Sequence, residues 1–158
     1  MSLSNWIKKL LAAGANEPDE GGTVTSEWYD EAHTVIVQRF EGKWRYRDAY
    51  FDLIEIKNRI DESPHLVDVI FDLRKSVRLP FVLWLSMRMP YLWFRHKWAK
   101  NIHRMVVVGG GSQANDLKFA RKRIAPGTMK FFRWVETIEE AEEQLRTWRL
   151  FEDEDGAP

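Results

Sequence analysis

The sequence predicts an α/β domain in which a mixed sheet of four or five strands is flanked by helices. Segments rich in β-branched residues alternate along the chain with segments of helical periodicity, which is typical of a largely parallel sheet. The wholly apolar run Met105–Val108 fits a central strand that is buried on both faces. A length of 158 residues, 44% hydrophobic and 30% charged, favours a single soluble globular domain.

The first half of the chain predicts a hairpin, a helix and a strand. Val24–Tyr29 and His33–Phe40 form the expected hairpin, with its turn at residues 30–32. A helix is expected at roughly 45–61 without a Ser, Thr or Asn cap at its start, and Ser63-Pro64 ends it. Its buried face is predicted from the spacing of Ala49, Leu53, Ile56 and Ile60. The next strand is Val67–Leu73, followed by a connector at Arg74–Arg78.

The second half predicts three helices and two strands. Residues 80–100 look helical, with a kink at Pro90, and a second helix follows Ser112. A last strand is expected at Lys130–Val135. Thr137 and Glu140 then form a capping box that opens the final helix. The inner face of that helix is predicted to consist of Ile138, Ala141, Leu145 and Trp148.

The predicted organisation is an N-terminal segment and linker at 1–22, a domain at 23–150 and an acidic tail at 151–158. The sequence has no cysteine and no predicted signal peptide, and its most apolar run, Leu79–Phe94, is too interrupted to cross a membrane. These features favour a cytoplasmic protein.

The charges are strongly segregated. Residues 73–135 contain 14 Lys and Arg but a single acidic residue, Asp116, although the whole chain has 24 basic and 24 acidic side chains. Such a chain can present a positive face to an anionic partner. The acidic residues Glu152–Asp155 are also able to cover that face.

Several of these segments together resemble the STAS and SpoIIAA-like superfamily. They are the hairpin that ends in Phe40-Glu41-Gly42-Lys43-Trp44, the strands at Val67–Asp72 and Val106–Gly109, and the ending Val135–Ala141. The resemblance covers roughly residues 24–147. It implies a sheet flanked by helices and a non-enzymatic domain that binds proteins, nucleotides or lipids. The phosphorylatable Asp-Ser-Ser-Gly pattern of that superfamily is absent, and Ser76, in the connector, is the nearest hydroxyl.

The segment 81–104 is the main candidate for a binding face, because aromatic and basic side chains alternate along it. Its candidate residues are Trp84, Arg88, Tyr91, Trp93, Phe94, Arg95, Lys97 and Trp98. Burial of one helix face against the sheet explains the pattern equally well. The functional alternatives are a protein or dimer interface, an anionic membrane surface or, least favoured, single-stranded nucleic acid.

The glycine run after Val108 is a second candidate site. Gly109-Gly110-Gly111-Ser112 lies between a strand and a helix, where backbone amides can hold a phosphate. Gly110, Gly111, Ser112 and Lys118 are the candidate anion-binding residues. A tight strand-to-helix turn is the simpler interpretation.

No catalytic constellation, metal-ligand spacing or cofactor site stands out. Asp68 and Asp72 point to the same side of their predicted strand, and Asp72 is the better placed to line a crevice. A capping or turn role is the simpler interpretation of both. The sequence therefore predicts a non-enzymatic regulatory or protein-interaction module, with a protein partner or a second copy of itself in a homodimer. The alternatives are lipid or membrane-surface binding through 81–104, and nucleotide or phosphate binding at Gly109–Ser112.

Overall fold

The structure, a computed structural model, describes residues 18–77, 99–109 and 132–155. Its five strands are β1 (Thr23–Trp28), β2 (Val35–Gly42), β3 (Val67–Ser76), β4 (Ile102–Val108) and β5 (Phe132–Val135). Its two helices are α2 (Tyr46–Glu62) and α6 (Ile138–Asp155). The predicted N-terminal segment up to residue 17 and the helices predicted at 80–100 and after Ser112 lie outside the described residues, apart from Ala99 and Lys100.

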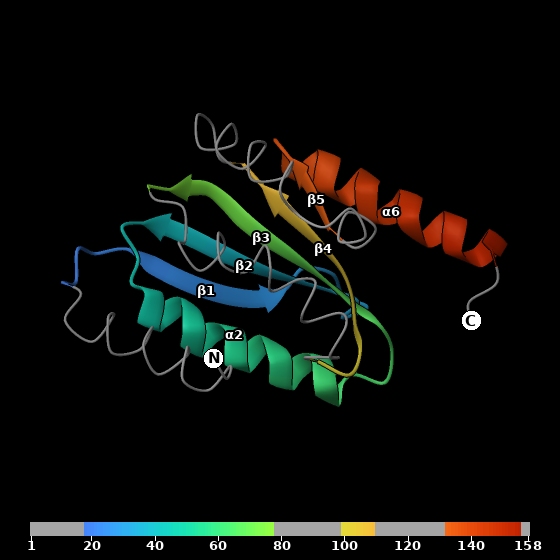
Figure 1. Ribbon diagram of the computed structural model, residues 1–158, viewed down its shortest axis with the longest axis horizontal. Coiled ribbons are helices and arrows are strands. Elements are labelled where there is room, and N and C mark those ends of the chain that lie inside the picture. Colours follow the sequence, from blue (N-terminus) through green and yellow to red (C-terminus); the bar gives the residue numbers. More distant parts are fainter. Residues whose placement is uncertain (1–17, 78–98, 110–131, 156–158) are drawn as a thin grey trace, which may run out of the picture.

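The strands form one sheet in the order β1-β2-β3-β4-β5 (Figure 1). β1 is antiparallel to β2, as a hairpin requires, and the remaining neighbours are parallel. The predicted mixed sheet of an α/β domain is therefore confirmed.

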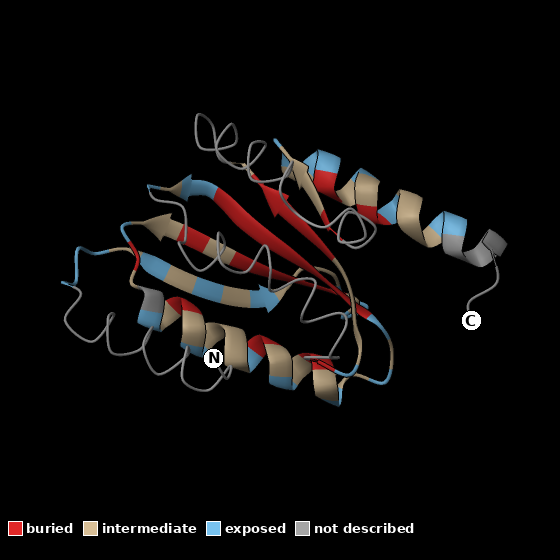
Figure 2. Ribbon diagram, in the orientation of Figure 1, coloured by how far each residue is buried: buried red, intermediate tan, exposed pale blue. Residues whose placement is uncertain are grey.

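The two described helices cover opposite faces of the sheet (Figure 1). Ala49, Ile56 and Ile60 of α2 pack on one face, whereas Ala141 and Leu145 of α6 pack on the other. Figure 2 shows burial concentrated along the central strands and on the inward sides of both helices. Successive residues from Met105 to Val108 alternate between these two cores, which confirms that this strand is buried on both faces.

Local interactions explain where several elements begin and end. Asp30 Oδ1 accepts hydrogen bonds from the backbone amides of Thr34 and Val35, which fixes the hairpin turn. The predicted capping box of α6 is confirmed, because Glu140 N donates to Thr137 Oγ1 and Glu140 Oε2 accepts from Thr137 N. α2 begins without a side-chain cap, as predicted, and Ser63 lies at its C-terminal end.

Three boundaries differ from the sequence prediction by three residues or more. β3 continues to Ser76 through residues expected in a connector, because Lys75 and Ser76 remain paired with Glu41 and Gly42 of β2. β4 begins at Ile102, three residues before the predicted apolar run. α6 extends to Asp155, so the acidic segment that was predicted as a tail from Phe151 is largely helical.

Candidate functional site

The predicted binding residues of segment 81–104 and the predicted anion-site residues Gly110, Gly111, Ser112 and Lys118 lie outside the described residues, so their placement stays a prediction. The described structure instead draws attention to the carboxyl ends of β2 and β3. Ligand crevices in parallel sheets lie characteristically at this edge.

A β-bulge in β3 shapes this edge. Arg39 pairs with Asp72 and Glu41 pairs with Lys75, so β3 advances three residues while β2 advances two. The extra residue reverses the alternation of side chains, and Lys75 therefore projects to the same side of the sheet as Asp72. In a regular strand these two side chains would lie on opposite faces. The sequence contains no glycine or proline at this point that would have predicted the bulge.

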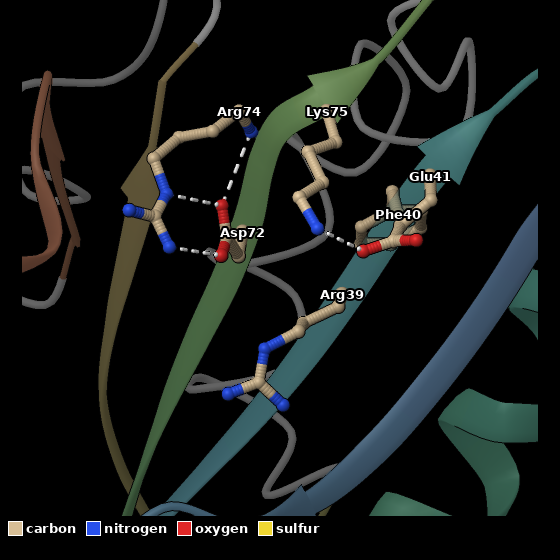
Figure 3. Close-up of a pocket in the computed structure, with 6 residues that line it drawn as sticks. All are labelled: Arg39, Phe40, Glu41, Asp72, Arg74 and Lys75. Atoms are coloured by element: carbon tan, nitrogen blue, oxygen red, sulfur yellow. Dashed lines mark hydrogen bonds and ion pairs between the residues drawn. The ribbon is translucent and has the colours of Figure 1, made fainter.

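The bulge lines a crevice of about 200 Å³, formed by Arg39, Phe40, Glu41, Asp72, Arg74 and Lys75 (Figure 3). It lies on the α6 side of the sheet, since Ile70, two residues before Asp72, packs in the α6 core. The prediction that Asp72 lines a crevice is confirmed. Arg39, Glu41, Arg74 and Lys75 were not predicted as site residues. The signal available was the appearance of charged residues at the end of an otherwise apolar strand.

Asp72 and Arg74 form the rigid part of the crevice. Asp72 Oδ1 accepts hydrogen bonds from Arg74 N at 3.1 Å and from Arg74 Nε at 2.9 Å, and Asp72 Oδ2 accepts from Arg74 Nη2 at 2.8 Å (Figure 3). The carboxylate thus holds both the bulged backbone and the guanidinium, which is the capping or turn role that the sequence favoured for Asp72. An exposed Arg74 side chain is thereby fixed in orientation.

Asp72 and Arg74 are both ionised at neutral pH. Burial is the largest single influence on Asp72 and raises its pKa, but hydrogen bonds from Arg74 and the charges of Arg74 and Arg39 outweigh it and leave the pKa below its ordinary value. The hydrogen bond to Asp72 correspondingly raises the pKa of Arg74. Asp72 is therefore ionised and poorly suited to act as a general acid near neutral pH.

The other charged side chains of the crevice are held more loosely. Lys75 Nζ lies 3.0 Å from Glu41 Oε1, and these side chains are 76% and 44% exposed. Arg39 forms an ion pair with Glu27 of β1, whose side chain is 62% exposed. Exposed ion pairs contribute about 0–1 kcal/mol to stability. An incoming ligand can therefore exchange these partners at small cost.

Gly109 brings the end of β4 against the crevice. Its φ is +88°, and a Cβ placed there would lie 2.8 Å from Arg74 Cγ and 2.9 Å from the Arg74 backbone. Glycine is needed at this position both for the backbone conformation and for the close approach. The first residue of the predicted glycine turn thus touches the same arginine that Asp72 fixes.

Asp68 serves a different purpose at the other end of β3. It is 1% exposed, and its Oδ2 accepts hydrogen bonds from Arg149 Nε and Nη2 of α6 at 3.1 and 2.5 Å. Its Oδ1 lies 2.8 Å from His103 Nδ1 and accepts from Arg104 N at 3.1 Å, within a second register shift, between β3 and β4. Asp68 therefore ties α6 to the sheet rather than lining the crevice.

Ser76 is engaged in the fold. Its Oγ accepts a hydrogen bond from Trp44 Nε1 at 2.9 Å, and the Trp44 side chain is fully buried. The bulge turns Ser76 toward the α2 core instead of the crevice. Ser76 therefore has a structural role as the acceptor for a buried indole.

A second cavity, of about 320 Å³, lies between the hairpin turn and α6. It is lined by Tyr29, Asp30, Val35, Glu142, Leu145, Arg146, Arg149 and Leu150. The hydrogen bond from the Tyr29 hydroxyl to Glu142 crosses this region and, together with burial, raises the pKa of Tyr29 to about 12. This hydrogen bond, like that of Asp68, fastens α6 to the sheet.

Comparison with known proteins returns no relative: no family model, no curated protein and no solved structure matches the chain. The fold and site therefore define the protein as an α/β domain with a mixed five-stranded sheet and a charged crevice. Among the described residues, no cluster of His, Asp and Glu is arranged to hold a metal ion. In the same part of the chain, no helix has the length and apolar character that crossing a bilayer requires.

Proposed function

We propose that the chain is a STAS-like regulatory module that works by binding a protein partner on the open face of its sheet. We call the open face that part of the α6 side of the sheet that α6 does not cover. It comprises Thr23, Thr25 and Glu27 of β1, Arg39 and Glu41 of β2, and Arg74 and Lys75 of β3.

The exposure of a parallel strand pair supports this proposal. Parallel strands are almost always covered on both faces. Val35 and Val37, in the first half of β2, follow that rule beneath α6, but Arg39 and Glu41 do not. On β3, Arg74 is 45% exposed and Lys75 76% exposed. Among the described residues, α6 alone covers this side of the sheet, and a protein surface that docks beyond it would complete that layer.

The composition of the open face favours a transient protein contact. Its cations and carboxylates alternate, and the two outer ion pairs are exposed. Such a surface gives orientation and a fast association rate rather than a permanent apolar interface. The lipid-surface alternative depends on segment 81–104, whose residues 81–98 lie outside the described residues.

Site-specific photo-crosslinking in cells tests the proposal. A crosslinker at Thr25, exposed on the open face, is expected to trap a discrete adduct, whereas one at Glu143, exposed on α6, is not. The trapped protein is then purified and its affinity measured. Lys75→Glu should weaken binding about tenfold or more, equivalent to about 1.4 kcal/mol, and Glu143→Lys should not.

Two outcomes separate the possible partners and one rejects the proposal. An adduct of twice the chain mass, with concentration-dependent association in the ultracentrifuge, identifies a second copy as the partner. A heavier or lighter adduct identifies a different protein. Equal crosslinking from both positions, or none from either, would show that the open face is a solvated surface.

A further inference from the structure

We propose that the crevice at the carboxyl ends of β2 and β3 binds a phosphate monoester, with Arg39, Arg74 and Lys75 as the residues that hold it. This inference deepens the proposed function, because it assigns a ligand chemistry to the centre of the same face.

Three cations line the same crevice. Arg39, Arg74 and Lys75 come from two strands and line one crevice of about 200 Å³, and the β3 bulge places Lys75 there (Figure 3). The lining contains three cations and two carboxylates, Glu41 and Asp72. Arg39 is also paired with Glu27, outside the lining, so the charges balance until Glu27 and Glu41 turn away from Arg39 and Lys75 and leave a positive site for a doubly charged anion.

The carboxylates around the crevice differ in how easily they release their cations to a ligand. The Asp72 side chain is 8% exposed, and both of its oxygens accept hydrogen bonds from the Arg74 side chain or backbone, so it is a fixed part of the crevice lining. Glu41 and Glu27 are exposed and can release Lys75 and Arg39 to a stronger acceptor. The crevice is therefore preorganised at Arg74 and adaptable at the two other cations.

The number and placement of the donors favour phosphate over carboxylate. The fork of an arginine binds either anion, and Asp72 already occupies the fork of Arg74. What remains are donors from three side chains at different positions around the crevice. This arrangement suits the several oxygens and the greater charge of a phosphate monoester, about −1.5 to −2 near neutral pH.

The end of β4 lies beside the crevice. Gly109 lies in van der Waals proximity to Arg74, with no room for a side chain between them. The turn that follows Val108 therefore starts at the rim of the crevice. A ligand held by Arg74 is adjacent to the end of β4, which is where nucleotide and phosphate ligands enter parallel sheets.

Phosphate binding is measured on the whole chain by calorimetry and by backbone amide shifts at constant ionic strength. The probes are O-phosphoserine, inorganic phosphate, phosphate-bearing nucleotide and acetate. The monoesters are expected to bind with dissociation constants in the millimolar range or tighter and to shift amides of β2 and β3, and acetate is expected to bind at least about tenfold more weakly.

The decisive variant is Arg39→Gln combined with Lys75→Ala. Both side chains are exposed enough that the fold should persist, which the thermal midpoint checks. The double variant should lose about tenfold or more in affinity for O-phosphoserine. Arg146→Ala, which removes an exposed arginine of α6, is the matched control and should bind as the unaltered chain does.

Each outcome decides the inference. Undetectable phosphate binding, equal binding of acetate, or binding that the double variant does not change would overturn it. Preference for O-phosphoserine over nucleotide points to a phosphorylated protein as the source of the group, and the reverse points to a metabolite. If the Thr25 adduct forms without phosphate binding, this inference alone fails; if phosphate binds without any adduct, the proposed function alone fails.

Discussion

Replacing Asp68 by alanine should remove much of the stabilising free energy of the contact between α6 and the sheet. The carboxylate is 1% exposed and joins β3 to Arg149 of α6, and it also accepts the Arg104 amide within the β4 register shift. Asp68→Ala removes the counter-ion of Arg149 and the acceptor of that amide together. Both losses act on the folded state.

The magnitude follows from these contacts. Removing one partner of a buried ion pair costs about 3–5 kcal/mol. Arg149 is 42% exposed and can turn toward water, which reduces the cost toward the value of about 1.5–3 kcal/mol for a hydrogen bond to a charged group. We expect a loss of about 3 kcal/mol. With a urea slope of about 1–3 kcal/mol per molar, the unfolding midpoint falls by about 1–3 M.

The assay is equilibrium urea unfolding at neutral pH, followed by tryptophan fluorescence. Glu143→Ala is the matched control, because Glu143 is an exposed carboxylate of the same helix, paired with Arg146, and should change stability by less than about 0.5 kcal/mol. If Asp68→Ala and Glu143→Ala shift the midpoint equally, the buried network does not anchor α6 and the reasoning is refuted.

Three further predictions concern Asp72, Tyr29 and Gly109. Because the pKa of Asp72 is lowered in the folded state, its contribution to stability is present above the unfolded pKa of about 3.9 and is lost as the pH falls through the folded pKa. Asp72→Asn should therefore flatten the decline in unfolding free energy below about pH 5. An unchanged pH profile would contradict this. Tyr29, with a pKa of about 12, should not ionise in the tyrosinate absorbance step near pH 10. Its contribution to stability should be lost as the pH rises from about 10 to 12. The late absorbance step should disappear in Tyr29→Phe, which checks the assignment. Gly109→Ala should destabilise the fold by more than Gly21→Ala, since both glycines have positive φ but only Gly109 would place a Cβ against Arg74, and thermal unfolding that ranks them in reverse would be incompatible with this packing.

Hydrophobic periodicity correctly predicted the elements whose apolar side chains face one core or two in a regular pattern. The spacing of Ala49, Ile56 and Ile60 identified α2, and the apolar run at Met105–Val108 identified a strand between two layers, because each of these side chains has a single favourable place to be buried. The capping box at Thr137 and Glu140 fixed the start of α6, since it depends on local hydrogen bonds alone.

The charged residues at the crevice were harder to interpret. Arg74 and Lys75 were expected in a connector, because charged residues after an apolar run normally signal the end of a strand. Their pairing with β2 and the bulge that redirects Lys75 depend on a neighbour far away in the sequence. Nothing local distinguishes such residues from a loop.

The sequence by itself determined the α/β class, the hairpin and the two helices, because these follow from local spacing and capping. The tertiary structure decided that β3 carries a bulge, that Arg39 joins Arg74 and Lys75 in one crevice, and that Asp68 binds a helix that begins 70 residues later in the chain. The physical reason is that strand register and long-range ion pairs depend on which strands lie side by side. That choice is made by the packing of the whole sheet.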